Sequence, residues 1–193
     1  LDAFNRAIIE LPISRVRTNQ KDCKGCDLCC AERAPLTWID VINLKTALKL
    51  KREPLNRVLK NISYIVVDGP VVDIMMRRGK DNKCIFLDRQ NKLCKIYHFR
   101  PLVCQVFICA PGSNAARWLW EIIVNQGEDE LVRRWLLDAR SKKTLPVFDK
   151  GFRPRPKISD WHPTAFAGKK SYREVLIKNI CPPELWSLIR NNY

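Results

Sequence analysis

The sequence has little glycine, little histidine and no long apolar run. Glycine accounts for 7 of the 193 residues, which excludes collagen-like repeats and glycine-rich linkers. The 2 histidines stand apart, and there is no HExxH motif, phosphate-binding loop, dinucleotide fingerprint or nucleophile elbow. No stretch of about 18 apolar residues occurs, so we expect no transmembrane helix. The catalytic and nucleotide-binding sites that these four motifs identify are therefore not predicted in this sequence.

The remaining composition is that of a globular protein. Hydrophobic residues make up 46% and charged residues 28%, which argues against intrinsic disorder. A chain of this length builds an apolar core without needing disulfides. Residues Leu1 to Glu10 are amphipathic, unlike the apolar centre of a signal peptide. We expect one domain, or one domain with an elaborated end.

The charge is strongly positive. Lysine and arginine total 35 against 20 acidic residues, a formal net charge of +15. Such an excess favours a protein complex or a polyanionic partner, with nucleic acid, an anionic membrane face and an acidic protein as candidates. A basic surface that is merely solvated is the alternative. No helix-turn-helix, RNA-recognition or classical zinc-finger pattern accompanies the charge.

The 9 cysteines are the main chemical signal. Their odd number excludes complete pairing into disulfides, and four of them fall within eight residues, a spacing that suits metal ligands better than disulfides. Thiolate ligands must stay reduced, so we expect a reducing intracellular compartment, either the cytoplasm or an organelle matrix. We take all of them as candidate metal ligands: Cys23, Cys26, Cys29, Cys30, Cys84, Cys94, Cys104, Cys109 and Cys181.

Hydrophobic periodicity and capping residues predict a mostly α-helical fold with a small β-hairpin. Thr37 and Asp40 form a capping-box pattern, and residues 64–67 and 71–76 alternate around a turn at Asp68-Gly69-Pro70. We expect one Cys-cluster, metal-centred domain over residues 1–111, with a helical extension over 112–193 packed on it. The expected helices are 2–10, 37–50, 54–62, 114–125 and 128–140 separated at Gly127, 171–180, and a last one opening at 181–184.

Two groups of cysteines carry the chemistry. The first is Cys23-x2-Cys26-x2-Cys29-Cys30, in which two-residue gaps let successive thiolates curl around one centre. The second group comprises Cys84-Ile-Phe-Leu, Cys94-Lys-Ile-Tyr97, Arg100-Pro-x-x-Cys104 and Cys109. The order and spacing of both groups point to a metal or iron–sulfur site.

Together with Thr37-x-x-Asp40, these motifs resemble the CxxCxxCC cysteine-cluster family, described as a zinc- or iron-chelating domain. The resemblance covers roughly residues 20–111 and leaves 112–193 without a counterpart. It implies a metal or iron–sulfur site. Some relatives are associated with lysine methylation of flagellin, so a metal- or cluster-dependent enzyme is one function that the resemblance suggests.

The residues leave the identity of the centre open. Cys23, Cys26 and Cys29 reproduce the Cys-x2-Cys-x2-Cys run of bacterial-type ferredoxins, with Cys181 before Pro182, or a cysteine of the second group, as the fourth ligand. One or two zinc ions are the alternative, because cysteines in two close pairs suit tetrahedral zinc. We favour one [4Fe–4S] cluster in an accessory or electron-transfer subunit. A zinc-stabilised binding module with a basic surface for nucleic acid or an acidic partner is the second hypothesis.

Two further residues are expected beside the centre. Arg100 lies in the family pattern and is expected either to hydrogen-bond a sulfur or a carbonyl there, or to form a buried salt bridge. Tyr97 is expected to shield the centre from water. Both are therefore candidate cofactor-binding residues.

Overall fold

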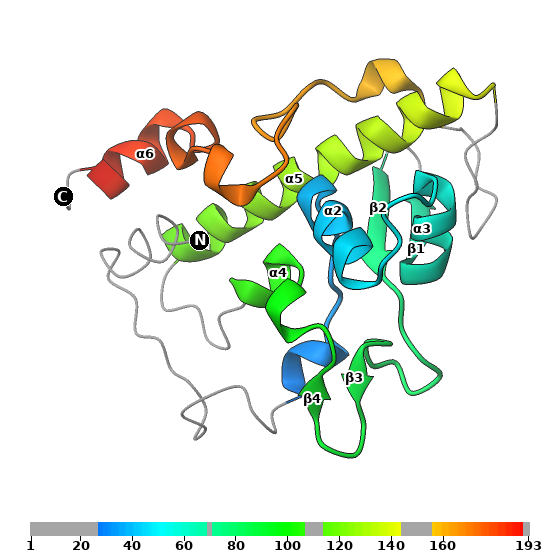
Figure 1. Cartoon of the computed structure of the whole chain (residues 1–193). Helices are drawn as coiled ribbons and strands as arrows, with labels where there is room; N and C mark the ends of the chain where they lie inside the picture. The colour runs from blue at the N-terminus through cyan, green and yellow to red at the C-terminus, as the bar shows by residue number, and fades with distance from the viewer. Residues whose placement is uncertain (1–26, 69–70, 107–113, 144–155, 191–193) are drawn as a thin grey trace.

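The computed structural model describes residues 27–68, 71–106, 114–143 and 156–190, and these parts are mostly helical with two small antiparallel sheets (Figure 1). The predicted fold class is therefore confirmed. The expected helix over 2–10 and the boundary at residue 111 lie outside the described residues, so the division into a domain and an extension stays a prediction. The helices and strands are α2 (Trp38–Ala47), α3 (Leu55–Ile62), β1 (Ser63–Asp68), β2 (Val71–Met76), β3 (Leu87–Asp88), β4 (Leu93–Cys94), α4 (Leu102–Gln105), α5 (Asn114–Ser141) and α6 (Pro183–Arg190). The 3₁₀ turns are η1 (Leu28–Ala31), η2 (Tyr97–Phe99), η3 (Ile158–Asp160), η4 (Tyr172–Glu174) and η5 (Ile177–Asn179).

Helix α2 begins where its capping box predicts. The Asp40 backbone N–H donates to the Thr37 hydroxyl over 3.1 Å, and the Thr37 N–H donates to the Asp40 carboxylate over 2.9 Å. These two bonds satisfy donors that a helix N-terminus otherwise leaves without partners. The cap is local, so the sequence alone identifies it.

The β1–β2 hairpin is also confirmed, with Ser63 opposite Met76 and Asp68 opposite Val71. The free edge of β2 is covered by the segment before α2, where the Leu36 N–H donates to the Ile74 carbonyl over 2.9 Å. Across the same edge, the Ile74 N–H donates to the buried carboxyl group of Glu128 in α5 over 2.8 Å. The hairpin is thereby joined to both α2 and α5.

Helix α5 is one continuous element of 28 residues, so the two helices expected on either side of Gly127 are a wrong prediction. Gly127 lies inside the helix, where a β-carbon would meet the side chains of Thr37 and Phe166. The glycine reflects a close helix contact rather than a helix end. Figure 1 shows α5 running diagonally across the molecule beside α2, with α4 below it in this view.

In the described parts of the chain, two hydrophobic clusters form the core. The first lies between α2, α3, the hairpin and the C-terminal half of α5, where Leu44, Ile62 and Trp135 are buried. The second joins the other side of α2, at Ile39, with α4, the N-terminal half of α5 and the C-terminal segment that includes Phe166. Helices α2 and α5 contribute side chains to both clusters. They therefore hold the two clusters in one arrangement, together with the hairpin, α3, α4 and the C-terminal segment that pack there.

The C-terminal segment differs in part from its prediction. The helix expected over 171–180 is wrong, because the structure has two short 3₁₀ turns, η4 and η5, in its place. Tyr172 points into the core and is held there by long-range contacts, which override the local helical pattern. Helix α6 is confirmed. Among the described helices none is both long and apolar enough to cross a bilayer.

Candidate metal centre

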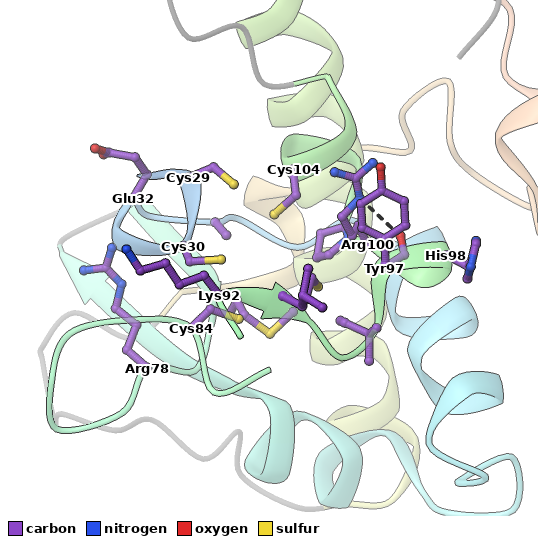
Figure 2. Close-up of a pocket in the computed structure, with 16 residues that line it drawn as sticks. Cys29, Cys30, Glu32, Arg78, Cys84, Lys92, Tyr97, His98, Arg100 and Cys104 are labelled. Carbon is purple, nitrogen blue, oxygen red and sulfur yellow. Dashed lines mark hydrogen bonds between the residues drawn. The ribbon is translucent and has the colours of Figure 1, made fainter. Parts of the chain in front are cut away.

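Five cysteines from four separate segments line one cavity of about 460 Å³. Cys29 and Cys30 belong to η1, Cys84 to the loop after β2, Cys94 to β4 and Cys104 to α4. Figure 2 shows the labelled thiols around this cavity, on different segments of the chain. All five are free thiols of intermediate exposure, so a ligand has access to them.

Two hydrogen bonds and an ion pair hold η1 against the loop that carries Cys84. The Cys84 N–H donates to the Cys30 carbonyl over 2.9 Å, and the Arg78 guanidinium donates to the Ala31 carbonyl. An ion pair between Lys83 and Asp27 joins the same two segments. These contacts bring together the two cysteine groups that lie more than fifty residues apart in the sequence.

The Cys-x-Phe and Cys-x-Ile motifs each place a backbone N–H beside the sulfur of their cysteine. The Phe86 backbone N–H donates to the Cys84 sulfur over 3.4 Å, and the Ile96 backbone N–H lowers the pKa of the Cys94 thiol. The β3–β4 pair places Leu87 opposite Cys94, so Cys84 lies just before the first strand of this short hairpin and Cys94 lies in its second strand. Hydrogen bonds to cysteine sulfur favour the thiolate and tune a metal centre bound to it.

Cys104 reaches the cavity from the short helix α4. Its N–H donates to the Pro101 carbonyl over 3.0 Å, which places Cys104 in the first turn. Pro101 has no side-chain hydrogen bond to cap this turn. Instead, the Asp40 carboxylate accepts the N–H of Leu102 over 2.8 Å. Asp40 thus caps two helices at once, a role that the capping-box pattern alone does not reveal.

Burial and crowding raise the pKa of four of the five cavity thiols. Burial raises the pKa of Cys84 and Cys94 and places that of Cys104 well above its ordinary value. The pKa of Cys29 is raised first by its hydrogen bond with Cys30 and then by burial. Neighbouring thiolate charges raise the pKa of Cys84 and Cys104 further. A bound cation would relieve this mutual repulsion, and the soft donor set fits zinc or iron.

The wall of the cavity is basic. Arg78, Lys92 and Arg100 line it, and Glu32 is the one acidic residue among its described lining residues. The Arg100 charge opposes the upward pKa shifts of Cys29 and Cys94. No sequence motif marks Arg78 or Lys92 as part of the site, because each of them approaches the cysteines only through folding. A positive wall stabilises thiolates and the negative charge that a thiolate-ligated metal retains.

The two candidate cofactor-binding residues lie together at this wall. The Arg100 guanidinium carbon is 4.1 Å from the centroid of the Tyr97 ring, and Arg100 Nε donates to the Tyr97 carbonyl over 3.2 Å. Both residues line the cavity, and Tyr97 is 45% exposed. The pair forms part of the cavity rim, with Arg100 on a carbonyl rather than in a salt bridge.

Of the remaining candidate ligands, the structure describes Cys181 alone. Cys181 is half-buried against the second hydrophobic cluster, where burial raises its pKa to about 11, and it does not line the cavity. Cys23, Cys26 and Cys109 lie outside the described residues. Within the described parts of the chain, no three cysteine, histidine or acidic side chains are grouped closely enough to hold a metal ion. The described thiols therefore form the wall of a site, and the choice of ligands stays a prediction.

Comparison with known proteins agrees with the motifs. A family model named CxxCxxCC, described as "Putative zinc- or iron-chelating domain", matches residues 22–123, past the residue 111 that the motifs indicated. The uncharacterized protein MJ0661 of Methanocaldococcus jannaschii is 34% identical over 84 residues, which cover 44% of this chain and 42% of that protein. The chain thus spans less than half of that relative's length. The comparison with solved structures found no match for this chain. Because the family match covers more than half of the chain, this protein belongs to the CxxCxxCC family of zinc- or iron-chelating domains.

Proposed function

We propose that this protein holds one cysteine-ligated [4Fe–4S] cluster and acts as an accessory or electron-transfer subunit. The observation that carries the proposal is the convergence of five free thiols from four separate segments on one cavity. Such a cluster supplies one-electron redox chemistry when bound.

The surroundings of the thiols support an iron–sulfur centre over a single small ion. The Phe86 N–H donates to the sulfur of Cys84, and the Ile96 N–H favours the thiolate of Cys94, a kind of contact that tunes the potential of iron–sulfur clusters. The cavity of about 460 Å³ is far larger than one tetrahedral ion enclosed by its own ligands requires. Cys23, Cys26 and Cys29 add the ferredoxin-like run.

The proposed ligands come from a defined pool. Four thiols are expected to hold the cluster, drawn from Cys23, Cys26, Cys29, Cys84, Cys94 and Cys104. The basic wall at Arg78, Lys92 and Arg100 is expected to offset the negative charge of the loaded site. These thiols have to stay reduced, which supports the proposal of a reducing compartment.

Metal analysis tests the proposal directly. The protein is purified without air, and its visible spectrum is recorded beside its iron, sulfide and zinc contents. We expect a brown protein with broad visible absorption and iron and sulfide in matching amounts. A colourless protein with one or two zinc ions would contradict the proposal and make the centre a structural clamp.

A matched pair of cysteine variants tests the location of the site. Cys94→Ala removes a thiol from the cavity, whereas Cys181→Ala removes a comparably half-buried thiol outside it. We expect Cys94→Ala to lose most of its iron and sulfide and Cys181→Ala to keep both. Loss of iron in Cys181→Ala with retention in Cys94→Ala would show that the centre is not in this cavity.

A further inference from the structure

Asp40 is the centre of a buried hydrogen-bond cluster that joins three distant parts of the chain. Its carboxylate is inaccessible to solvent and accepts hydrogen bonds from the Leu102 N–H, the Thr37 N–H and the Tyr172 hydroxyl. The Tyr172 and Thr37 hydroxyl oxygens are 2.6 Å apart. The three donors come from the start of α2, the start of α4 and the C-terminal segment.

The bond to Leu102 acts directly on the candidate metal site. Leu102 is the first residue of α4 and lies two residues before Cys104. The Leu102 N–H is capped by Asp40 instead of by a residue of its own helix. Any change in the position of the Asp40 carboxylate therefore moves the turn that presents the Cys104 sulfur to the cavity.

Tyr172 is the donor that the family pattern does not include, because the match ends at residue 123. Its ring meets Phe166 edge to face, with centroids 6.4 Å apart, and Phe166 is fully buried. The hydroxyl is thus delivered to Asp40 by core packing of the C-terminal segment. A buried carboxylate needs such donors, because each missing hydrogen bond leaves part of its negative charge without a partner.

We propose that Tyr172 is a positioning residue for the metal centre: through Asp40, its hydroxyl holds the first turn of α4 so that Cys104 faces the cavity. Its role for a bound metal rests on the proposed function, whereas the positioning itself is a property of the metal-free protein. The C-terminal segment thereby supports a cavity whose five described cysteines all lie before it in the sequence.

The test is Tyr172→Phe, which keeps the ring against Phe166 and removes only the hydroxyl. Its control is Tyr64→Phe, which removes the hydroxyl of a half-buried tyrosine on β1. In the full-length, metal-free, reduced proteins, NMR measures hydrogen exchange at the Leu102 amide, and mass spectrometry measures alkylation of Cys104 and Cys94 by iodoacetamide. In the metal-loaded proteins, a chelator is used to measure the rate of metal loss.

We expect Tyr172→Phe to speed exchange at Leu102 by about tenfold, the size of effect that one lost hydrogen bond to a buried charge produces. The Cys104 alkylation rate should change by at least about threefold while that of Cys94 stays constant, and the chelator should remove metal faster by a similar factor. Tyr64→Phe should match the wild-type protein in all three measurements. Unchanged exchange at Leu102 in Tyr172→Phe, or an equal change in Tyr64→Phe, would overturn the proposal.

A second variant separates action through Asp40 from a general loss of stability. Asp40→Asn keeps the size of the side chain and removes its charge, so it should speed Leu102 exchange by itself. In that background, adding Tyr172→Phe should have little further effect, because coupled residues are not additive. Independent, additive effects of the two changes would contradict the assigned route. Should Tyr172→Phe fail to fold, the Asp40→Asn exchange measurement still decides whether the carboxylate holds α4.

The two proposals fail in distinguishable ways. A protein that binds zinc or no metal contradicts the cluster while leaving the exchange and alkylation tests of Tyr172 intact. A loaded [4Fe–4S] protein with no effect at Leu102 contradicts the positioning role alone.

Discussion

Gly127 lies so close to Thr37 that a β-carbon at residue 127 would stand 2.5 Å from the Thr37 γ-methyl carbon. Gly127 is in the middle of α5, and Thr37 is the N-cap of α2. The same added carbon would be 3.2 Å from the ring of Phe166. The absence of a side chain is therefore what lets α5 pack against the cap of α2 and the C-terminal segment.

Gly127→Ala is expected to destabilise the fold. Alanine gains about 1 kcal/mol over glycine in an exposed helix, but the clash with Thr37 should cost more, for a net loss of about 1–2 kcal/mol. Urea unfolding followed by circular dichroism measures the change. Asn125→Ala, on the exposed side of α5, is the control and should be neutral or slightly stabilising. A Gly127→Ala protein as stable as Asn125→Ala would contradict the contact.

A second change should relieve that clash. Thr37→Ser removes the γ-methyl carbon that the new methyl group would meet and keeps the hydroxyl that caps α2. The double variant Thr37→Ser with Gly127→Ala should therefore lose less free energy of unfolding than the sum of the two single changes. Simple additivity in the same urea experiment would place the strain elsewhere.

Glu128 should make the protein less stable as the pH rises. Burial raises its pKa from 4.5 to about 8, so the folded state keeps a proton that the unfolded state releases. The protonated Glu128 side chain makes its whole contribution to the free energy of unfolding below about pH 4.5. As the pH rises, this contribution falls by up to about 1.4 kcal/mol per pH unit, and the decrease ends above about pH 8. Glu128→Gln keeps an oxygen for the Ile74 N–H and should flatten this slope, as unfolding at several pH values will measure.

Three other acids set the control for that experiment. Burial also raises the pKa of Asp40, to about 6, and the pKa of Asp73 and Asp129, so a smaller slope of the same sign should remain in Glu128→Gln. At pH 8 the variant should be more stable than the wild-type protein. An unchanged slope would mean that Glu128 is ionised in the folded state at neutral pH.

Among the acidic residues of α5, Glu130 is expected to be the one whose replacement costs the most free energy of unfolding. It is fully buried and binds Arg133 over 2.9 Å and Arg134 over 2.8 Å. Arg134 also lies 4.5 Å from the centroid of the Trp38 ring, so the group links α5 to α2. Glu130→Ala should cost about 2–3 kcal/mol in thermal or urea unfolding, because two partly buried guanidinium groups lose their partner.

The exposed ion pair between Lys142 and Asp138 is the comparison. Asp138→Ala at this pair should change stability by less than about 1 kcal/mol. A similar cost for both alanine variants would show that burial does not distinguish the two ion pairs.

Cys181 should react slowly with alkylating agents. Burial raises its pKa to about 11, so only about one thiol in a thousand is ionised at pH 8. Its alkylation rate should rise by about tenfold per pH unit from pH 7 until the fold is lost or the pKa is reached. Peptide mass spectrometry after brief iodoacetamide treatment measures this rate. A rate at pH 8 equal to that of glutathione would contradict the burial of this thiol.

The sequence by itself determines the elements whose interactions are local. The capping box at Thr37 and Asp40 and the alternation in the β1–β2 hairpin act over a few residues, and the structure has both elements. The motif at Cys84 is local too, because the residue two positions later supplies the N–H for its sulfur. The family and the donor chemistry can therefore be recognised from the order and spacing of the residues alone.

Only the tertiary structure decides the features that depend on contacts between distant residues. The interior position of Gly127 depends on Thr37, 90 residues away, and local signals indicated a helix end there. The Tyr172 hydroxyl donates to Asp40, 132 residues away, and Cys29 and Cys104 line one cavity although they are far apart in the sequence. Packing free energy and buried hydrogen bonds set these features, and they exist only once the whole core has formed.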